Sequence, residues 1–187
     1  ASVDAGCDIT ACENQAALDG ESQGCIAVTW STSGDGTFAD ASLESTDYYP
    51  GTNDIANGHA EICLTGYFGD NQSVSDCLNI TISENPEIEA GFTELDVCYN
   101  QPVEITLASA ENFSSITWYT TNGGGYFSNN TGASVTYNPA PTVDYPQGCI
   151  TVFALAQPVA PCNLVDEISF DVCFQPNPEL NPGFQQL

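Results

Sequence analysis

The residue pattern that most resembles a catalytic motif is Gly20-Glu21-Ser22-Gln23-Gly24, which fits G-x-S-x-G. A serine nucleophile in this motif needs a strand–turn–helix setting and a histidine base. No helical periodicity follows Ser22, and His59 is the only histidine. We therefore interpret the match as chance in a glycine-rich loop, and His59 as a surface strand residue. We expect no catalytic site and no enzyme.

The aspartates are the other candidates for chemistry, as ligands for a hard cation. Asp35, Asp40 and Asp54 fall on or near the loops expected in the first half of the chain. Carboxylates and loop carbonyls suit calcium, although neither EF-hand nor nonapeptide spacing is present. Calcium is the only cofactor that the sequence leaves open. The alternative is diffuse screening of the acidic surface by cations.

The charge of the chain restricts its partners more strongly than any motif does. Lysine and arginine are absent, against 25 aspartates and glutamates, so the formal net charge is −25. Phosphate repels such a chain, which argues against nucleic-acid binding, and anionic membranes repel it too. No apolar run reaches the roughly 18 residues that a membrane span needs. A solvated, self-repelling surface explains the composition, and cations are its natural partners.

Nine cysteines without a C-x-x-C pair indicate disulfide bonds and an oxidising compartment. Opposite residues of a hairpin have index sums that stay constant, and on this basis Cys63 pairs with Cys77, and Cys149 with Cys173. Cys98 and Cys162 then remain as a candidate pair in the second half. In the first half we expect Cys7 to pair with Cys25, which leaves Cys12 free or bridging to another chain.

Four sequons fit the N-glycosylation pattern, which asparagine- and threonine-rich strands also create by chance. They begin at Asn71, Asn79, Asn112 and Asn129.

The chain repeats itself, and the repeat sets the domain organisation. The first copy runs through "VDAGCDITACENQ", "VTWSTSGDGTF" and "YYPGTNDIANGHAEICL", and the second through "IEAGFTELDVCYNQ", "ITWYTTNGGGYF" and "TYNPAPTVDYPQGCITVF". Cys12 matches Cys98, Trp30 matches Trp118, and Tyr49-Pro50 matches the stretch from Tyr137 to Pro139. We expect one module over residues 1–85 and a second over residues 86–176.

Each copy has the pattern of about seven short strands. Apolar and polar residues alternate from Val28 to Thr32, and turn residues recur every 8–12 positions. We expect hairpin turns at Ser33-Gly34-Asp35-Gly36 and Asn122-Gly123-Gly124-Gly125. This pattern predicts an all-β fold of two tandem immunoglobulin-like antiparallel β-sandwiches, stapled by disulfides, with Trp30 and Trp118 in their cores.

A third partial copy closes the chain. "NPELNPGFQQL" at 177–187 repeats "NPEIEAGFTEL" at 85–95, which opens the second module. Either the sequence is cut from a longer tandem array, or this strand is donated to the next subunit of a filament. The residues that would anchor such an assembly segment are Leu180, Phe184 and Leu187.

These blocks resemble the PKD-like and immunoglobulin-like repeats of very large cell-surface proteins and adhesins of Bacteroidota. The first module carries the resemblance through Ala5-Gly6, Trp30, Ser33-Gly34-Asp35-Gly36, Tyr49-Pro50-Gly51 and Asn57-Gly58. The second departs from it where Gly124 replaces the aspartate of the turn. The resemblance implies export, cell-surface display and a spacer or adhesive role, with no enzymatic activity.

The leading hypothesis is therefore a structural or adhesive repeat unit of an extracellular filament or giant adhesin, which assembles end to end with copies of itself or adjacent modules. The alternative is a pair of carbohydrate-binding modules that bind surface glycans. A planar row of exposed aromatic side chains would favour the alternative, and the candidates are Tyr48, Tyr67 and Tyr119.

Overall fold

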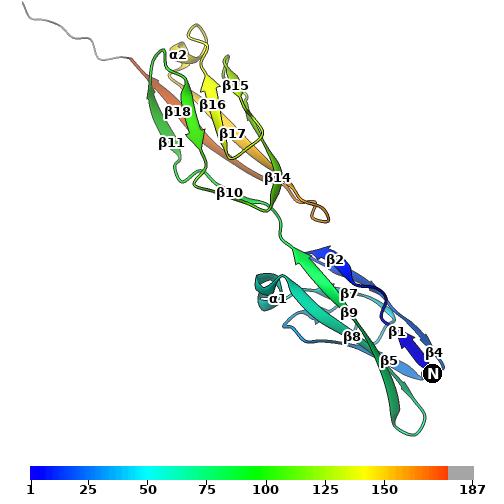
Figure 1. Ribbon diagram of the computed structural model, residues 1–187. Coiled ribbons are helices and arrows are strands. Elements are labelled where there is room, and N and C mark those ends of the chain that lie inside the picture. The colour runs from blue at the N-terminus through cyan, green and yellow to red at the C-terminus, as the bar shows by residue number, and fades with distance from the viewer. Residues whose placement is uncertain (177–187) are drawn as a thin grey trace, which may run out of the picture. The chain divides into compact units, whose positions relative to one another are not determined.

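The computed structural model describes residues 1–176, and the chain forms two compact units (Figure 1). Unit 1 consists of Ala1–Asn85 and the segment Pro158–Leu164, and unit 2 consists of Pro86–Gln157 and the described residues from Val165. The expected assembly segment with Leu180, Phe184 and Leu187 lies outside the described residues.

Unit 1 contains nine strands and one short helix. Its four-stranded sheet has the order β2-β9-β8-β5, with bounds Ile9–Cys12, Gln72–Ser83, His59–Phe68 and Ala27–Thr32. Its three-stranded sheet has the order β3-β7-β6, with bounds Ala16–Asp19, Ser45–Tyr49 and Thr37–Phe38. A short pair joins β1 (Ser2–Asp4) to β4 (Glu21–Gln23), and helix α1 (Thr52–Asn57) connects β7 to β8.

Unit 2 repeats this topology element by element. Its four-stranded sheet has the order β11-β18-β17-β14, with bounds Glu94–Cys98, Asp166–Gln175, Cys149–Pro158 and Phe113–Thr120. Its three-stranded sheet has the order β12-β16-β15, with bounds Val103–Thr106, Ser134–Asn138 and Tyr126–Ser128. The short pair joins β10 (Glu87–Glu89) to β13 (Ser109–Glu111), and α2 (Asp144–Gln147) connects β16 to β17.

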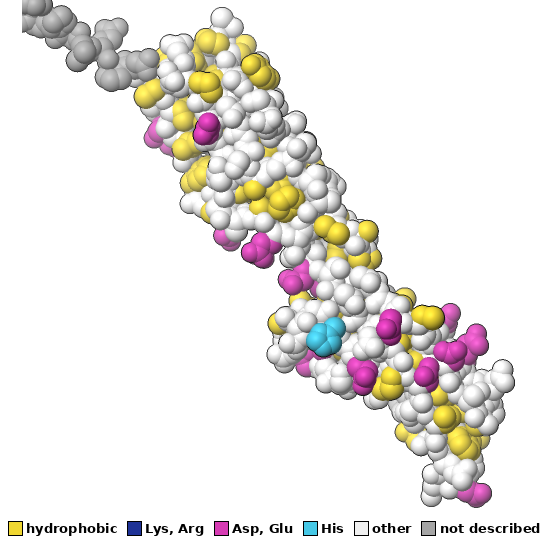
Figure 2. All heavy atoms as spheres, viewed as in Figure 1, with side chains coloured by type: hydrophobic (Ala, Val, Ile, Leu, Met, Phe, Trp, Pro, Cys, Tyr) yellow, Lys and Arg dark blue, Asp and Glu magenta, His cyan; other side chains and the backbone are white. Residues whose placement is uncertain are grey.

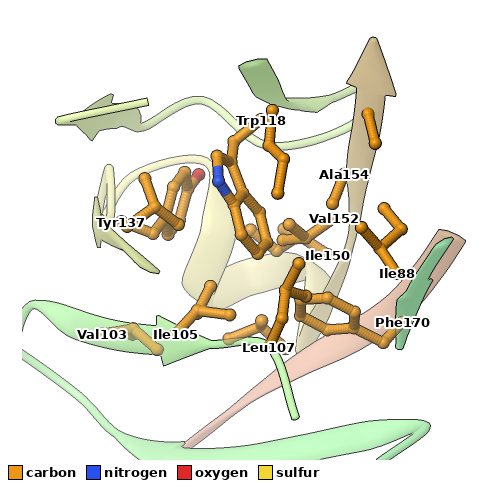
Figure 3. Close-up of a cluster of buried hydrophobic side chains, with 14 of the residues drawn as sticks. Ile88, Val103, Ile105, Leu107, Trp118, Tyr137, Ile150, Val152, Ala154 and Phe170 are labelled. Carbon is orange, nitrogen blue, oxygen red and sulfur yellow. The ribbon is translucent and has the colours of Figure 1, made fainter. Parts of the chain in front are cut away.

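The core of each unit lies between its sheets, because period-2 alternation turns one face of every strand inward. In unit 2, Trp118 of β14 packs with Tyr137, Ile105 and Phe170, which come from both sheets (Figure 3). Trp30 holds the corresponding place in unit 1, and both tryptophans are buried. The indole Nε1 of Trp30 donates to the backbone oxygen of Leu43 at 2.9 Å, which satisfies the only polar atom of its side chain.

The repeat pattern predicted antiparallel strands throughout, but each unit contains one parallel strand pair. β2 runs parallel to β9, and β11 runs parallel to β18. In each unit the opening segment first pairs antiparallel in the short pair and then crosses to the four-stranded sheet. The crossing occurs at Gly6 (φ 93°) and Gly91 (φ 79°), where a positive φ favours glycine.

The two glycine-rich segments expected as hairpin turns are crossovers instead. Ser33–Gly36 connects β5 of one sheet to β6 of the other, and residues 121–125 make the same connection in unit 2. The glycines are needed for close approach rather than for positive φ. A Cβ atom at Gly34 would lie 1.7 Å from a carboxylate oxygen of Asp54, and one at Gly36 would lie 2.3 Å from the hydroxyl of Tyr48.

Residues 1–176 contain three disulfide bonds. Cys63–Cys77 joins opposite residues of the β8–β9 hairpin, and Cys149–Cys173 joins opposite residues of the β17–β18 hairpin, which are the pairs that the index sums favoured. The third bond, Cys12–Cys162, was not expected. It attaches the segment Pro158–Leu164 to the end of β2 within unit 1.

The predicted pairs Cys98–Cys162 and Cys7–Cys25 are wrong. Cys98 lies opposite Gln175 at one end of β18, whereas Cys162 precedes the other end of that strand, about ten residues away. Ten residues of extended strand span roughly 33 Å, far beyond disulfide reach.

In unit 1, the neighbours of Cys7 bond to Asp76 and Asn79 in the body of β9, whereas Cys25 lies beside Tyr67 at the hairpin end. Cys7, Cys25 and Cys98 therefore remain free thiols, and Cys12 does not.

Both helices are short, and within residues 1–176 no helix has the length and apolar character to cross a membrane.

Candidate functional site

A buried carboxylate occupies the end of unit 1 where α1 begins. Asp54 is 2% exposed, and its carboxylate accepts hydrogen bonds from the backbone N–H groups of Asp35 (3.3 Å), Gly36 (3.0 Å) and Gly51 (3.1 Å). The hydroxyl of Tyr48 donates a fourth bond at 2.5 Å. Four neutral donors thus stabilise this carboxylate without any cation.

Two further aspartates accept hydrogen bonds from loop residues, Asp35 beside this site and Asp40 in the loop between β6 and β7. The carboxylate of Asp35 accepts from the backbone N–H groups of Asn53 and Asp54, both at 3.2 Å. The Asn53 bond is the main cause that lowers the pKa of Asp35. Asp40 accepts from the hydroxyl of Ser42 at 2.6 Å and from its N–H at 2.9 Å, and the hydroxyl bond chiefly lowers the pKa of Asp40.

These hydrogen bonds leave the calcium site a prediction that the arrangement of the three aspartates does not support. Asp35, Asp40 and Asp54 do not form a group whose ligand atoms all lie within 4.8 Å of one another. The reason is that each carboxylate is directed at loop donors of its own. Within the described residues such a group does arise at Glu61, Cys63 and Cys77, but the two sulfurs are joined in a disulfide and offer no thiolate to a metal.

Unit 2 contains the same arrangement around Asp144, which is fully buried. Its carboxylate accepts from the N–H groups of Gly124 (2.6 Å) and Ala140 (2.7 Å) and from the hydroxyl of Tyr137 (2.8 Å). The Tyr137 hydroxyl in turn accepts from the N–H of Gly125 at 2.9 Å. We call the Tyr48–Asp54 and Tyr137–Asp144 arrangements the tyrosine–aspartate locks.

The locks were not predicted from the sequence because Tyr49 was matched to Tyr137 in the repeat. The buried donors are Tyr48 and Tyr137, and Tyr49 is exposed. The signal that could have found the pair is tyrosine-x-proline followed four or five residues later by aspartate, since Pro50 precedes Asp54 and Pro139 precedes Asp144.

Burial dominates the electrostatics of both tyrosines. Desolvation by burial is the main cause that raises the pKa of Tyr48 to about 12, and the hydrogen bond to Asp54 raises it further. The same two causes, in the same order, raise the pKa of Tyr137. Both hydroxyls therefore remain protonated donors at every physiological pH.

The residues of the serine motif lie apart from any base. Ser22 is on β4 and donates to the carboxylate of Glu44 at 2.5 Å, while His59 begins β8 and its Nδ1 contacts the backbone oxygen of Asn57 at 2.9 Å. A serine on a strand with a carboxylate partner has neither the sharp turn nor the imidazole that a nucleophile elbow needs.

The candidate sugar-binding aromatics do not form a planar row. Tyr48 is fully buried, Tyr67 is exposed on β8 of unit 1, and Tyr119 lies on β14 of unit 2. The Tyr119 ring stacks on Phe153 at 4.9 Å between centroids, and its hydroxyl donates to Glu167. That hydrogen bond is the main cause that raises the pKa of Tyr119. One face of its ring is thus covered by a neighbour.

The four sequon asparagines are exposed. Asn71 lies in the β8–β9 turn, Asn79 on β9, and Asn112 and Asn129 at positive-φ positions beside β13 and β15. Glycosylation of these residues stays a prediction.

The visible surface carries scattered aspartates and glutamates and a histidine, and no lysine or arginine (Figure 2). A surface of this kind offers its partners carboxylates and backbone or hydroxyl groups, and no cationic clamp for an anionic ligand.

No protein-family model matches this chain, and no curated protein matches it. Solved structures of tandem immunoglobulin domains do. The IG1 and IG2 domains of DIP-gamma match with a TM-score of 0.50 and 11% identity over 96% of this chain and 99% of that one. Extracellular domains 3–5 of Drosophila OTK match with a TM-score of 0.51 and 9% identity, over 93% of this chain and 62% of that one.

An I-band fragment of titin matches with a TM-score of 0.50 and 11% identity, over 94% of this chain and 65% of that one. This chain therefore spans less than two thirds of the OTK and titin fragments. Identities this low establish the fold alone. The prediction of an all-β chain of two tandem immunoglobulin-like sandwiches is confirmed, apart from the parallel strand pair in each unit.

We expect that Tyr48→Phe lowers the free energy of unfolding by about 1.5–3 kcal/mol, because it leaves a buried carboxylate one donor short. Tyr137→Phe should cost a similar amount in unit 2. Tyr67→Phe is the matched control, since an exposed hydroxyl contributes less than about 0.5 kcal/mol. Denaturant unfolding followed by the fluorescence of Trp30 and Trp118 measures all three. Losses equal to that of the control would show that the locks are not structural.

The locks also predict how stability depends on alkaline pH. The folded pKa of Tyr48 is about 12 and its ordinary value is 10.0. The contribution of its protonated hydroxyl is therefore complete below pH 10 and is lost as the pH rises toward 12. Tyrosinate absorbance should show Tyr48 and Tyr137 ionising late and together with unfolding. Replacing the three free cysteines by serine prevents thiol exchange during the titration. Ionisation of all eight tyrosines in one step near pH 10, with the fold intact, would contradict the locks.

Proposed function

We propose that this chain is a structural and adhesive repeat unit of an extracellular surface filament or large adhesin, and that it carries tension from one end to the other without catalysing a reaction. The observation that carries this proposal is the Cys12–Cys162 disulfide, which joins residues 150 positions apart in the sequence. The two modules of the proposed repeat unit span residues 1–85 and 86–176.

The disulfide shortens the covalent path along which a pulling force is transmitted between the two ends. A force applied between the two ends enters through the residues before Cys12, crosses the sulfur–sulfur bond, and leaves through the residues after Cys162. Most of both sandwich cores lies between Cys12 and Cys162 and outside this covalent path, whereas Phe170, Val172 and Phe174 of β18 lie on it. The bond therefore shields the segment from Cys12 to Cys162 from direct extension.

The two shorter disulfides suit the same role in another way. Cys63–Cys77 and Cys149–Cys173 each join neighbouring strands of one hairpin, with sequence separations of 14 and 24. They fix the register of the hairpin that lies at the centre of each four-stranded sheet. A disulfide at this place resists separation of the two central strands, to which the outer strands of the sheet are hydrogen-bonded.

The setting of the proposed function is the outside of a cell. Three disulfides need an oxidising compartment to persist. The net charge of −25 keeps isolated copies apart and soluble in salt. The Bacteroidota surface repeats that the sequence resembles, and the extracellular domains of OTK that it matches in fold, support display at a cell surface.

We propose copies of the same chain or adjacent modules as the partners, joined end to end. The arrangement of Trp30, Trp118, Tyr48 and Tyr119 does not favour the carbohydrate-binding alternative, because the first three are buried and Tyr119 stacks on Phe153. A glycan array probed with the intact protein decides between the two, and specific binding at millimolar sugar would support the alternative.

Single-molecule pulling between the two ends tests the load-bearing role. With the disulfides intact, we expect a short extension that involves only the residues before Cys12 and after Cys162. Reduction of all three disulfides should release about 500 Å of additional contour length, because 150 residues extend at roughly 3.3–3.6 Å each. The substitution Cys12→Ser should release less, about 370–400 Å, because the loops of 14 and 24 residues closed by the other two disulfides stay shut.

The matched control is the pair of substitutions Cys63→Ser and Cys77→Ser, which removes a disulfide outside the covalent path and should keep the extension short. Full-length extension of the oxidised wild-type chain would contradict the proposed function.

A further inference from the structure

Cys98 occupies in unit 2 the place that Cys12 occupies in unit 1. Cys12 is the last residue of β2 and lies beside Ser83 of the parallel strand β9. Cys98 is the last residue of β11 and lies beside Gln175 of the parallel strand β18. Cys12 is bonded to Cys162, whereas Cys98 is a free thiol and exposed. The equivalent position thus forms a disulfide in one unit and is unpaired in the other.

The partner of Cys12 shows what kind of cysteine fits this position. Cys162 lies in the loop between β17 and β18, at the turn end of a hairpin whose strands belong to the other module. The pairing is therefore between the strand-end cysteine of one module and a cysteine at the hairpin-turn end of the module that follows. Applied to Cys98, the same pairing needs a cysteine at the hairpin-turn end of a further module.

Such a cysteine is present in unit 1 of every copy of this chain. The β8–β9 turn itself, residues 69–71, contains no cysteine, but Cys25 lies beside it. The backbone N–H of the next residue, Ile26, donates to the oxygen of Tyr67 at 2.7 Å, only two residues before the turn. The Cys25 sulfur packs over Gly66, is half-buried and is free.

Cys7, the remaining free thiol, does not meet this condition. Its neighbours Ala5 and Asp8 bond to Asp76 and Asn79, in the body of β9 and away from the turn. Cys7 is exposed and Cys25 is half-buried, so access alone does not favour Cys25 as the partner of Cys98. The position of Cys25 beside the hairpin turn favours it, and Cys7 is therefore the control.

We propose that Cys98 of one copy forms an intermolecular disulfide with Cys25 of the next copy, so that the chain polymerises covalently head to tail. This inference rests on the proposed end-to-end assembly and names the residues that join the subunits. The contact is heterologous, because two different surfaces meet, and a heterologous contact repeats without a fixed end unless it closes into a ring.

The reaction needs an oxidant, and a small-molecule disulfide such as oxidised glutathione supplies it. The thiolate of Cys98 attacks one glutathione sulfur and releases a glutathione thiolate, leaving a mixed disulfide on the protein. The thiolate of Cys25 from the next copy then attacks the Cys98 sulfur and releases the second glutathione. Two protein thiols are oxidised to one disulfide, and one oxidised glutathione is reduced to two thiols.

The charge of the chain determines the salt concentration at which two copies should join fastest. Two copies of net charge −25 repel each other, and neither has a basic side chain to offset the repulsion. Salt at physiological strength reduces the screening length to about 8 Å, whereas dilute buffer leaves it near 30 Å. Covalent joining should therefore be faster at physiological salt than in dilute buffer.

The test incubates the intact protein with oxidised glutathione at physiological salt and separates the products on a non-reducing gel. We expect a ladder of dimer, trimer and longer species that collapses to monomer on reduction. Cys98→Ser and Cys25→Ser should each abolish the ladder, and Cys7→Ser should leave it unchanged. An equimolar mixture of the Cys98→Ser and Cys25→Ser variants should stop at dimer, because each variant retains one of the two reacting thiols.

Three results would overturn the inference. Wild-type protein that stops at dimer would indicate a symmetric Cys98–Cys98 bond. A ladder that survives Cys25→Ser but not Cys7→Ser would assign the partner to Cys7. Absence of any covalent species would exclude the bond altogether. Circular dichroism of each variant checks that the exchange of an unpaired cysteine has left the fold intact.

Electron microscopy of the reduced protein separates this inference from the function on which it rests. End-to-end filaments without a covalent ladder would refute the Cys98–Cys25 bond and leave the assembly role standing. Neither filaments nor a ladder, across the same salt range, would count against both.

Discussion

The absence of lysine and arginine is the constraint on which the rest of this structure depends. A buried carboxylate is normally stabilised by a cation or by several hydrogen bonds, and here only the second means exists. Asp54 and Asp144 are the two buried charged residues within the described chain, and each is surrounded by N–H and hydroxyl donors. Throughout residues 1–176, no buried side-chain nitrogen or oxygen lacks a partner.

This requirement explains the local architecture of both modules. The donors of the unit 1 lock come from the crossover after β5, from Tyr48 on β7 and from the backbone that enters α1. One carboxylate thereby connects the edge of the four-stranded sheet to the three-stranded sheet. Glycine is required in the crossover because the backbone must approach the carboxylate more closely than any Cβ atom allows. A chain with basic residues could have closed the same gap with a salt bridge.

Much of the fold follows from local patterns in the sequence, and most of the errors come from contacts that no local pattern records. Alternation along β5 and the position of Trp30 identify a core strand, and index sums within one hairpin identify Cys63–Cys77, because both depend on neighbouring residues. Cys12–Cys162 depends on a loop of the second module that belongs to unit 1, and this cannot be read from spacing.

The calcium prediction finds no support in the geometry for a related reason. Aspartates near loops are the usual ligands of a hard cation, but Asp54 is directed inward at backbone donors that a sequence does not display. The repeat did contain the necessary information, since Pro50 and Asp54 recur as Pro139 and Asp144. An alignment shifted by one residue, from Tyr48 to Tyr49, concealed the hydroxyl donor that completes each lock.

The Cys12–Cys162 bond combines two roles in the present account. It closes a loop of 150 residues, which in the chain-entropy model stabilises the folded state by about 5 kcal/mol, and it provides the covalent path that would bear tension. Disulfide mapping of the non-reduced protein tests it most directly, with free thiols alkylated first and peptic digestion in acid to prevent exchange. The monomer should give a peptide pair that joins Cys12 to Cys162, together with alkylated Cys7, Cys25 and Cys98. A peptide pair that joins Cys98 to Cys162, or an alkylated Cys12, would contradict this prediction.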